Sequence, residues 1–205
     1  MFFDTQDPDY FKAKPTPFKA CVIPRPIAWI TTCGVDGVIN IAPFSYFNAV
    51  ADNPPMIMIS TASKEKGRVP KDTLRNIQET GEFVVNMVSY AQVEAMNLTS
   101  ATLPYGQSEL SLVDLPLLPS EKIKPPRIAG SFVQLECVHW QTLDLPVTNP
   151  LYGNHLTLGK VVGIHVHEDA FTAGHIDPLK LDMVARLGYD QYARIREIFT
   201  LVRPK

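Results

Sequence analysis

The sequence predicts a mainly β protein with a few short helices, organised as one domain over residues 1–205. Two observations lead to this prediction. Short apolar or alternating runs are separated by turn signals at hairpin spacing, and six or more such runs favour a closed antiparallel sheet over a doubly wound one. Proline accounts for 18 of the 205 residues, roughly twice the usual share of about 5%. This composition favours short strands and rigid loops over long helices.

The first half of the chain contains four predicted strands, at 27–33, 38–41, 56–61 and 82–88. The first two form a hairpin, because Asp36-Gly37 between them supplies the positive φ that a tight turn demands. Pro54-Pro55 stops any helix before the third strand.

The second half contains two longer predicted strands, at 131–140 and 155–167, whose polarity alternates as in a half-buried strand. Three short helices are predicted: one capped by Asp72-Thr73 and stopped by Gly81, one at 91–98 and one at 190–199. The stretch 102–126 carries five prolines and little periodicity. We expect it to form a long ordered excursion over the surface, covering a site or a subunit contact.

Charge and composition argue against several classes of function. Lys plus Arg number 19 and Asp plus Glu 21, so the net charge is −2 and no basic stripe is present to neutralise a nucleic acid. No apolar run approaches the length of about 18 residues that a membrane helix needs, and the start MFFDTQDPDYF does not resemble a signal peptide. We therefore expect a cytoplasmic protein that binds neither nucleic acid nor membrane.

The cysteines and histidines predict no metal site. Cys21, Cys33 and Cys137 show no CxxC spacing, and a small buried side chain is the expected role of each in a reducing compartment. His165 and His167 share one face of a predicted strand, but no third ligand stands near them in the sequence. The motifs of Rossmann dehydrogenases, P-loop enzymes, zinc proteases and serine hydrolases are all missing.

Two neighbouring segments have the chemistry of a mononucleotide site. Ser45 to Ala49 place hydroxyls, an amide and backbone N–H groups between two strands, which suits a flat heteroaromatic ring with polar edges. Lys71, Asp72 and Thr73 stand at a predicted helix start, where free N–H groups and the dipole favour an anion. A ring site and a phosphate site together indicate FMN, while a capped helix beside a buried polar turn remains the alternative.

Five segments resemble the flavin reductase-like, FMN-binding split-barrel family, in particular its flavoredoxin-like branch. They are PRPIAWITT, NIAPFSYFNAVADNPP, KDTLRNIQETGEFVVN, GNHLTLGKVVGIHVHED and VARLGYDQYARIREIF, between Pro24 and Phe199. The resemblance implies an antiparallel, Greek-key-like split β-barrel. It also implies a homodimer with FMN at the subunit interface.

The same resemblance assigns roles to individual residues. The cofactor-binding positions are Thr31, Ser45, Tyr46, Phe47, Asn48, Ala49, Ser60, Lys71, Asp72 and Thr73. His155 and Arg186 fall in the later motifs and are candidates for the substrate side, with a structural hydrogen bond and an ion pair as their alternatives. Tyr189 follows Gly188 where the family often has a double glycine, so we expect its ring to crowd or line the pocket.

The function implied is that of an FMN-dependent oxidoreductase in which NADH or NADPH reduces the bound flavin. The electrons then pass to an acceptor, such as a monooxygenase component or another partner protein. The cofactor carries this chemistry, so the protein needs no acid–base dyad. Two alternatives stay open: a flavoredoxin-like electron carrier with little turnover of its own, and a flavin-binding protein with no turnover.

Overall fold

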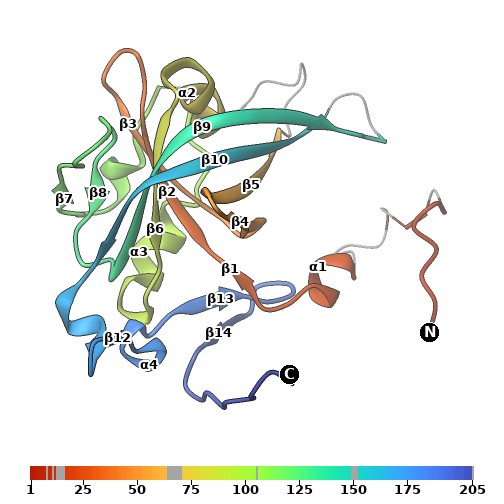
Figure 1. Ribbon diagram of the computed structural model, residues 1–205. Helices are drawn as coiled ribbons and strands as arrows, with labels where there is room; N and C mark the ends of the chain where they lie inside the picture. The colour runs from red at the N-terminus through yellow and green to blue at the C-terminus, as the bar shows by residue number, and fades with distance from the viewer. Residues whose placement is uncertain are drawn as a thin grey trace.

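The computed structural model describes residues 1–7, 9–10, 12, 17–63, 71–104, 106–148 and 152–204. The described chain is mainly antiparallel β with short helices, as the sequence predicts (Figure 1). One seven-stranded sheet dominates it, with the strand order β3-β2-β6-β9-β10-β5-β4. Its strands are β2 (Ala28–Cys33), β3 (Ile39–Phe44), β4 (Phe47–Asp52), β5 (Pro55–Ser63), β6 (Glu82–Met87), β9 (Val133–Leu145) and β10 (Gly153–Val166).

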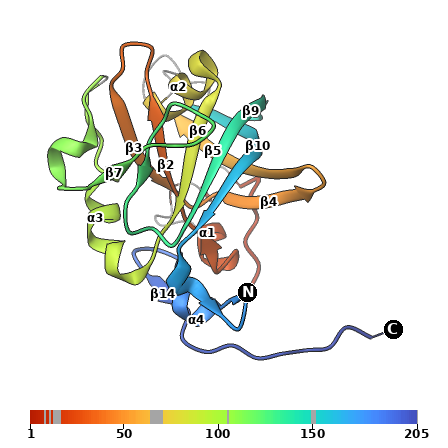
Figure 2. The ribbon, with the colours of Figure 1, turned by 60° about the vertical axis from the view of Figure 1, so that its left-hand side comes forward.

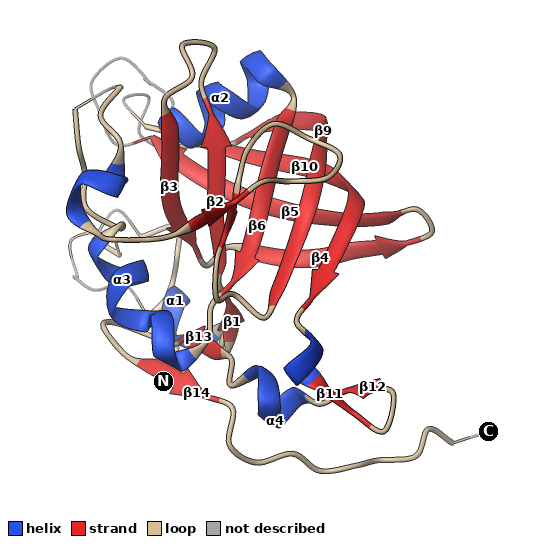
Figure 3. Ribbon diagram, turned by 90° about the vertical axis from the view of Figure 1, so that its left-hand side faces the viewer, coloured by secondary structure: helices blue, strands red, loops and turns tan. Residues whose placement is uncertain are grey.

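The sheet curls around its own apolar face (Figure 3). Its two edge strands, β3 and β4, are consecutive in the chain and are joined by Ser45-Tyr46, and β3 also contacts β5. Strand β4 was not predicted from the sequence, and β9 and β10 extend their predicted strands toward the hairpin between them. The curl therefore brings the predicted ring-binding segment to the place where the two ends of the sheet meet.

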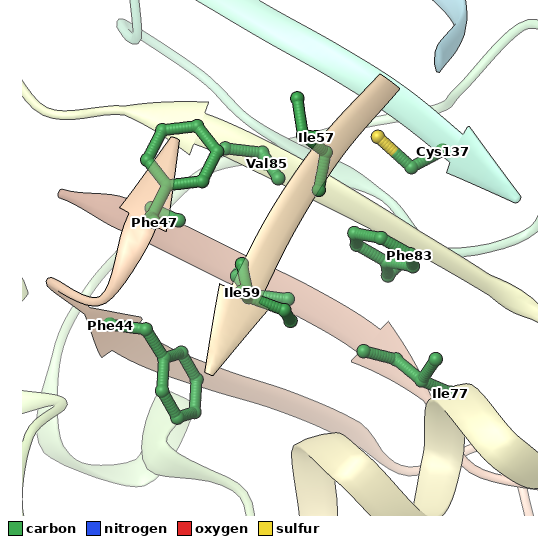
Figure 4. Packing of buried hydrophobic residues seen from close by; sticks show 10 residues of the cluster. Phe44, Phe47, Ile57, Ile59, Ile77, Phe83, Val85 and Cys137 are labelled. Carbon is green, nitrogen blue, oxygen red and sulfur yellow. The ribbon is translucent and has the colours of Figure 1, made fainter. Parts of the chain in front are cut away.

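The inner face of the curled sheet holds the larger apolar core (Figure 4). Phe44 and Phe47, on either side of the turn, pack with Ile59 of β5 and Phe83 of β6. Ile77 closes this core from α2 (Asp72–Thr80). Gly81 ends that helix in the left-handed conformation at φ 76°, as predicted. The predicted cap is wrong, because the N-cap position is Lys71, whose side chain has no acceptor to offer.

A second core lies on the outer face of β2 and β3. Trp29 and Ile41 pack there with Met96 of α3 (Val93–Leu98) and with Ile128. The Trp29 indole donates a hydrogen bond to the Thr99 hydroxyl over 2.9 Å. This core supports the proline-rich stretch 102–126, which we call the strap.

Carboxylates hold the strap against the sheet. Glu136 of β9 is fully buried and accepts hydrogen bonds from the backbone N–H groups of Glu121 (2.8 Å) and Lys122 (2.7 Å). His165 lies 2.6 Å from the same carboxylate. Glu109 of the strap reaches back to β3, where it accepts hydrogen bonds from the Asn40 amide and the Ile41 N–H.

Three small sheets complete the described strands. The first contains β1 (Arg25–Pro26), β13 (Val184–Arg186) and β14 (Tyr192–Arg194); the others pair β7 (Leu117–Leu118) with β8 (Arg127–Ile128) and β11 (Phe171–Thr172) with β12 (His175–Ile176). The remaining helices are α1 (Phe18–Cys21), α4 (Pro178–Leu181) and the 3₁₀ turns η1 (Tyr90–Gln92), η2 (Glu109–Leu112) and η3 (Glu168–Ala170). Among the described helices, none is both long and apolar enough to cross a membrane.

The helix predicted at 190–199 is wrong. Residues 192–194 form β14, which pairs with β13, and 195–204 run as an extended segment away from the body of the molecule (Figure 2). Arg194 fixes the strand by donating to both oxygens of Asp182 over 2.5 Å each and by stacking 3.8 Å over the Tyr90 ring. These non-local contacts outweigh the helical spacing of the apolar residues.

Candidate functional site

The turn Ser45-Tyr46 lies at a cation-rich corner of the molecule. Arg25, only 6% exposed, donates from Nε to the Ser45 hydroxyl over 3.5 Å and from its NH2 group to the Leu187 carbonyl over 2.9 Å. It also donates to the Lys19 carbonyl of α1. The Tyr46 ring has the Lys19 ammonium and the Arg25 guanidinium each 5.9 Å from its centroid. Burial raises the pKa of the Tyr46 phenol, with the Arg25 charge opposing that effect.

Lys71 places another cation beside the residue that precedes this turn. Its Nζ lies 5.7 Å from the centroid of the Phe44 ring, the residue directly before the turn. Ser60 of β5 joins the turn as well, donating its N–H to the Tyr46 carbonyl over 2.7 Å. The structure therefore brings Ser45 and Tyr46 together with Ser60, and places Lys71 beside the residue that precedes the turn, so three segments that the sequence analysis selected separately lie near one another.

The segment after the turn is divided between core and surface. Phe47 is 7% exposed and belongs to the inner core, so its side chain packs against protein. Asn48 and Ala49 are exposed on β4, where the Asn48 side-chain oxygen accepts the Ala49 N–H over 2.9 Å. Only part of the predicted ring-binding segment is thus open to a ligand through its side chains.

Three of the predicted cofactor contacts, Thr31, Asp72 and Thr73, have side chains that are engaged by other partners. Thr31 is completely buried, and its hydroxyl donates to the Pro126 carbonyl under the strap. The Thr73 hydroxyl donates to the Asn40 side chain over 2.7 Å. The Asp72 carboxylate accepts the Gly106 N–H over 3.3 Å. In the first turn of α2 the side chains of Asp72 and Thr73 are therefore already engaged within the chain.

A polar cluster at the end of β5 contains the predicted candidate His155 and two residues that the sequence analysis missed, Thr61 and Ser63. Thr61 and Ser63 are both 2% exposed, and in the sheet register they pair with His155 and Gly153 of β10. The Asp144 carboxylate lies 2.7 Å from His155 Nδ1. Within the described chain, Thr61 Oγ1, Ser63 Oγ and His155 Nε2 are buried without a hydrogen-bond partner. The sequence does contain a pattern that could have identified them. Ile57, Ile59, Thr61 and Ser63 lie on one face of the strand, and the side chains on this face change from apolar to hydroxyl-bearing.

Arg186 and Tyr189 lie on the other side of the cation-rich corner. Arg186 stacks 4.5 Å from the Tyr192 ring centroid and donates to the Tyr189 carbonyl and, over 3.3 Å, to Asp190. It pairs in register with Arg25, whereas His155 belongs to the main sheet, so the two substrate-side candidates occupy different sheets. Tyr189 has φ 58° and is 52% exposed.

The model of the family described as flavin reductase-like domain matches residues 20–189. A crystal structure of nitrilotriacetate monooxygenase component B from Bacillus cereus is 36% identical, with TM-score 0.88 and 98% of each chain covered. The 2-nitrobenzoate 2-nitroreductase of Pseudomonas fluorescens is 28% identical, with TM-score 0.84 and coverage of 100% and 96%. A split-barrel-domain protein of Shewanella frigidimarina described as a flavin reductase has TM-score 0.80 at 22% identity, covering 98% of this chain and 94% of that chain. The curled sheet is thus a split β-barrel, and the chain belongs to the flavin reductase-like family.

Proposed function

We propose that this protein is an FMN-dependent oxidoreductase that takes electrons from NADH or NADPH and passes them to an acceptor. The observation that carries the proposal is the contact of the Ser45-Tyr46 turn with Ser60 of β5, with Lys71 beside the neighbouring Phe44 ring, in a flavin reductase-like chain. Hydroxyl, amide and N–H groups suit the polar rim of a flavin, and the cations suit its phosphate.

The residues present fit FMN by the chemistry of their donors. Thr61, Ser63 and His155 each have a buried polar atom without a hydrogen-bond partner in the described chain. Such atoms are expected in a binding site whose ligand supplies the missing hydrogen bonds. Ser45 and the exposed backbone around Ala49 would hold the ring edge, and Lys71 with the first turn of α2 would hold the phosphate. When bound, the flavin supplies the two-electron redox chemistry, and the protein positions it and controls the access of water.

The acceptor remains a proposal with two supported candidates. The similarity to a monooxygenase component B favours a partner protein that uses the reduced flavin. The similarity to a nitroreductase favours an aromatic nitro compound. NAD(P)H consumption by the pure protein with added FMN, measured with and without 2-nitrobenzoate, tests both. If NADH and NADPH are not consumed while FMN stays bound, the protein is instead a flavoredoxin-like electron carrier. We propose the cytoplasm as its location.

The first expected result is a preference for FMN over riboflavin. A charge-assisted hydrogen bond to phosphate contributes about 1.5–3 kcal/mol, so the preference should be roughly tenfold to a hundredfold. Lys71→Ala should narrow it, whereas Lys122→Ala, at an exposed position on the strap, should leave it unchanged. Fluorescence titration of both flavins measures the ratio. Equal affinities in the unmodified protein would contradict the phosphate assignment.

We further propose that the protein is a homodimer with FMN at the interface. Phe199, Leu201 and Val202 of the extended C-terminal segment are 83%, 82% and 89% exposed. An apolar arm of this kind needs a surface to cover it, and two-fold pairing is the commonest solution. Light scattering should give twice the 22.8 kDa of one chain.

Replacing Phe199 and Leu201 together by Ser should shift the equilibrium of this dimer toward monomer. The matched control replaces Glu197 and Arg203, two charged residues of the same segment, by Ser and should leave it intact. If the Phe199 and Leu201 variant becomes a monomer and still binds FMN as tightly as the unmodified protein does, the proposal that FMN lies at the interface is wrong.

A further inference from the structure

The outer face of β5 carries apolar side chains that belong to neither core of the described chain. Ile57 and Ile59 belong to the inner core. Because side chains alternate between the two faces of a strand, Met56, Met58 and Ser60 lie on the outer face. Both methionines are partly exposed. Apolar side chains on a sheet face outside both cores indicate a surface that another element covers.

The neighbouring strands β10 and β9 extend this surface. Met58 pairs in register with Leu158 of β10, and Leu156 of β10 pairs with Leu143 of β9. Residues that pair directly across antiparallel strands share a face of the sheet. Trp140 stands at the bulge of β9 beside this row and is 67% exposed. The outer apolar face, as we call it, is made of Met56, Met58, Leu143, Leu156 and Leu158.

Strand β4 forms the edge of the sheet beside the outer apolar face. It is the last strand in the sheet order, and each of its residues after Phe47 is exposed. Asn48 pairs in register with Met58, so this predicted flavin contact lies on the outer apolar face, as Ser60 does. An exposed edge strand whose side chains are uncharged from Asn48 to Ala51 favours association with another chain.

The C-terminal arm, residues 195–204, supplies apolar side chains that such a surface would bury. Phe199, Leu201 and Val202 are largely exposed, and the arm runs away from the body of its own chain (Figure 2). Its ten extended residues span up to about 33 Å. The four strands β9, β10, β5 and β4 are only about 14 Å across at the usual strand spacing. The arm is therefore long enough to cross the whole face.

We propose that the C-terminal arm of one chain lies across the outer apolar face of a second copy, next to Asn48 and Ser60. Each chain carries one arm and one such face, so a two-fold pair covers both arms and both faces. The inference rests on the proposed function, because it names the surface on which the proposed dimer forms. The arm of one chain then forms a wall of the flavin site of the other, and each site is incomplete without it.

Two leucines of equal exposure provide a matched pair of variants. Leu143 of the outer apolar face is 40% exposed and Leu112 of the strap is 41% exposed. Leu143→Ser should weaken the dimer about tenfold or more, because each dimer buries two such leucines, and light scattering on dilution measures this change. It should weaken the binding of FMN and of riboflavin by the same factor, because the arm lies beside the ring-binding residues. Leu112→Ser should change neither quantity.

Cross-linking between two chains tests the contact directly in protein without flavin. One chain carries Leu143→Cys and the other Leu201→Cys, both with Cys21→Ser because Cys21 is exposed. A bis-maleimide reagent should join the mixed chains into a covalent species of twice 22.8 kDa, whereas a mixture of Leu112→Cys with Leu201→Cys should give none.

The outcomes of this experiment separate the arm from the proposed function. Absence of the covalent species, or a double variant that cross-links only within one chain, would overturn the placement of the arm and leave the proposed function intact. A covalent species from a protein that binds no flavin and consumes neither NADH nor NADPH would support the placement of the arm and overturn the proposed function.

Discussion

Replacing Glu136 by Ala is expected to cost several kcal/mol of unfolding free energy, because each of the two strap N–H groups that loses its buried acceptor costs about 1–3 kcal/mol. The carboxylate is fully buried and accepts from two strap N–H groups, with His165 2.6 Å away. Urea unfolding measures the loss. The exposed side chain of Glu121, on the strap itself, provides the control: Glu121→Ala should change stability by less than about 0.5 kcal/mol.

The same carboxylate should make stability depend on pH in a predictable direction. Burial opposes its ionisation, but the hydrogen bonds from the Glu121 N–H, from His165 and from the Lys122 N–H outweigh burial and lower the pKa of Glu136. A lowered folded pKa means that Glu136 contributes stability above its unfolded pKa of about 4.3. This contribution is lost as the pH falls through the lower folded value.

Glu136→Gln isolates this contribution. The difference in stability between wild type and variant should be constant near pH 7 and should shrink in acid. The comparison with the variant is needed because burial raises the pKa of Glu109. Ionisation of Glu109 therefore lowers the stability of the folded protein as the pH rises, which is opposite to the effect of Glu136. A difference that does not change between pH 7 and pH 3 would show that the negative charge of Glu136 does not stabilise the strap.

The local parts of the fold could be predicted, and the parts that failed depend on distant partners. Helix α2 was predictable because Leu74 and Ile77 share one face and Gly81 supplies the left-handed stop. The helix at 190–199 failed because β13 recruits residues 192–194 into a strand, a pairing with no local signal.

The candidate site likewise contains residues that could be predicted from local sequence and residues that could not. Ser45, Tyr46 and Lys71 were found from local chemistry, and the structure places Lys71 beside Phe44, the residue directly before Ser45. The Thr73 hydroxyl was assigned to a phosphate because the sequence does not show its partner Asn40, which Glu109 holds from 69 residues away. Thr61 and Ser63 were missed because their significance depends on the register of β5 with β10.

Replacing Gly188 by Ala is expected to lower both stability and flavin affinity, because α1 packs directly against this glycine. A Cβ atom at Gly188 would lie 2.5 Å from the Cβ of Ala20 and 2.8 Å from its Cα, so Gly188→Ala must push α1 away. Overpacking of this kind costs about 1–3 kcal/mol. Because the Lys19 carbonyl accepts from Arg25 and the Lys19 ammonium lies over Tyr46, displacing α1 should also weaken flavin binding.

Two comparisons make this expectation specific. Gly163→Ala introduces the same methyl group in β10, where the nearest atom lies 3.4 Å away, an ordinary contact, and it should leave flavin affinity unchanged. Adding Ala20→Gly to Gly188→Ala removes the closest contact but leaves the Cα at 2.8 Å, so it should recover part of both losses, with a coupling energy above about 0.5 kcal/mol. Thermal unfolding and FMN titration of the wild type, the three variants above and the single variant Ala20→Gly, which the coupling energy requires, measure both quantities. If Gly188→Ala lowers stability while FMN affinity stays at the wild-type value, α1 does not shape the flavin site, and the cation-rich corner formed by Lys19, Arg25 and Tyr46 is a structural feature only.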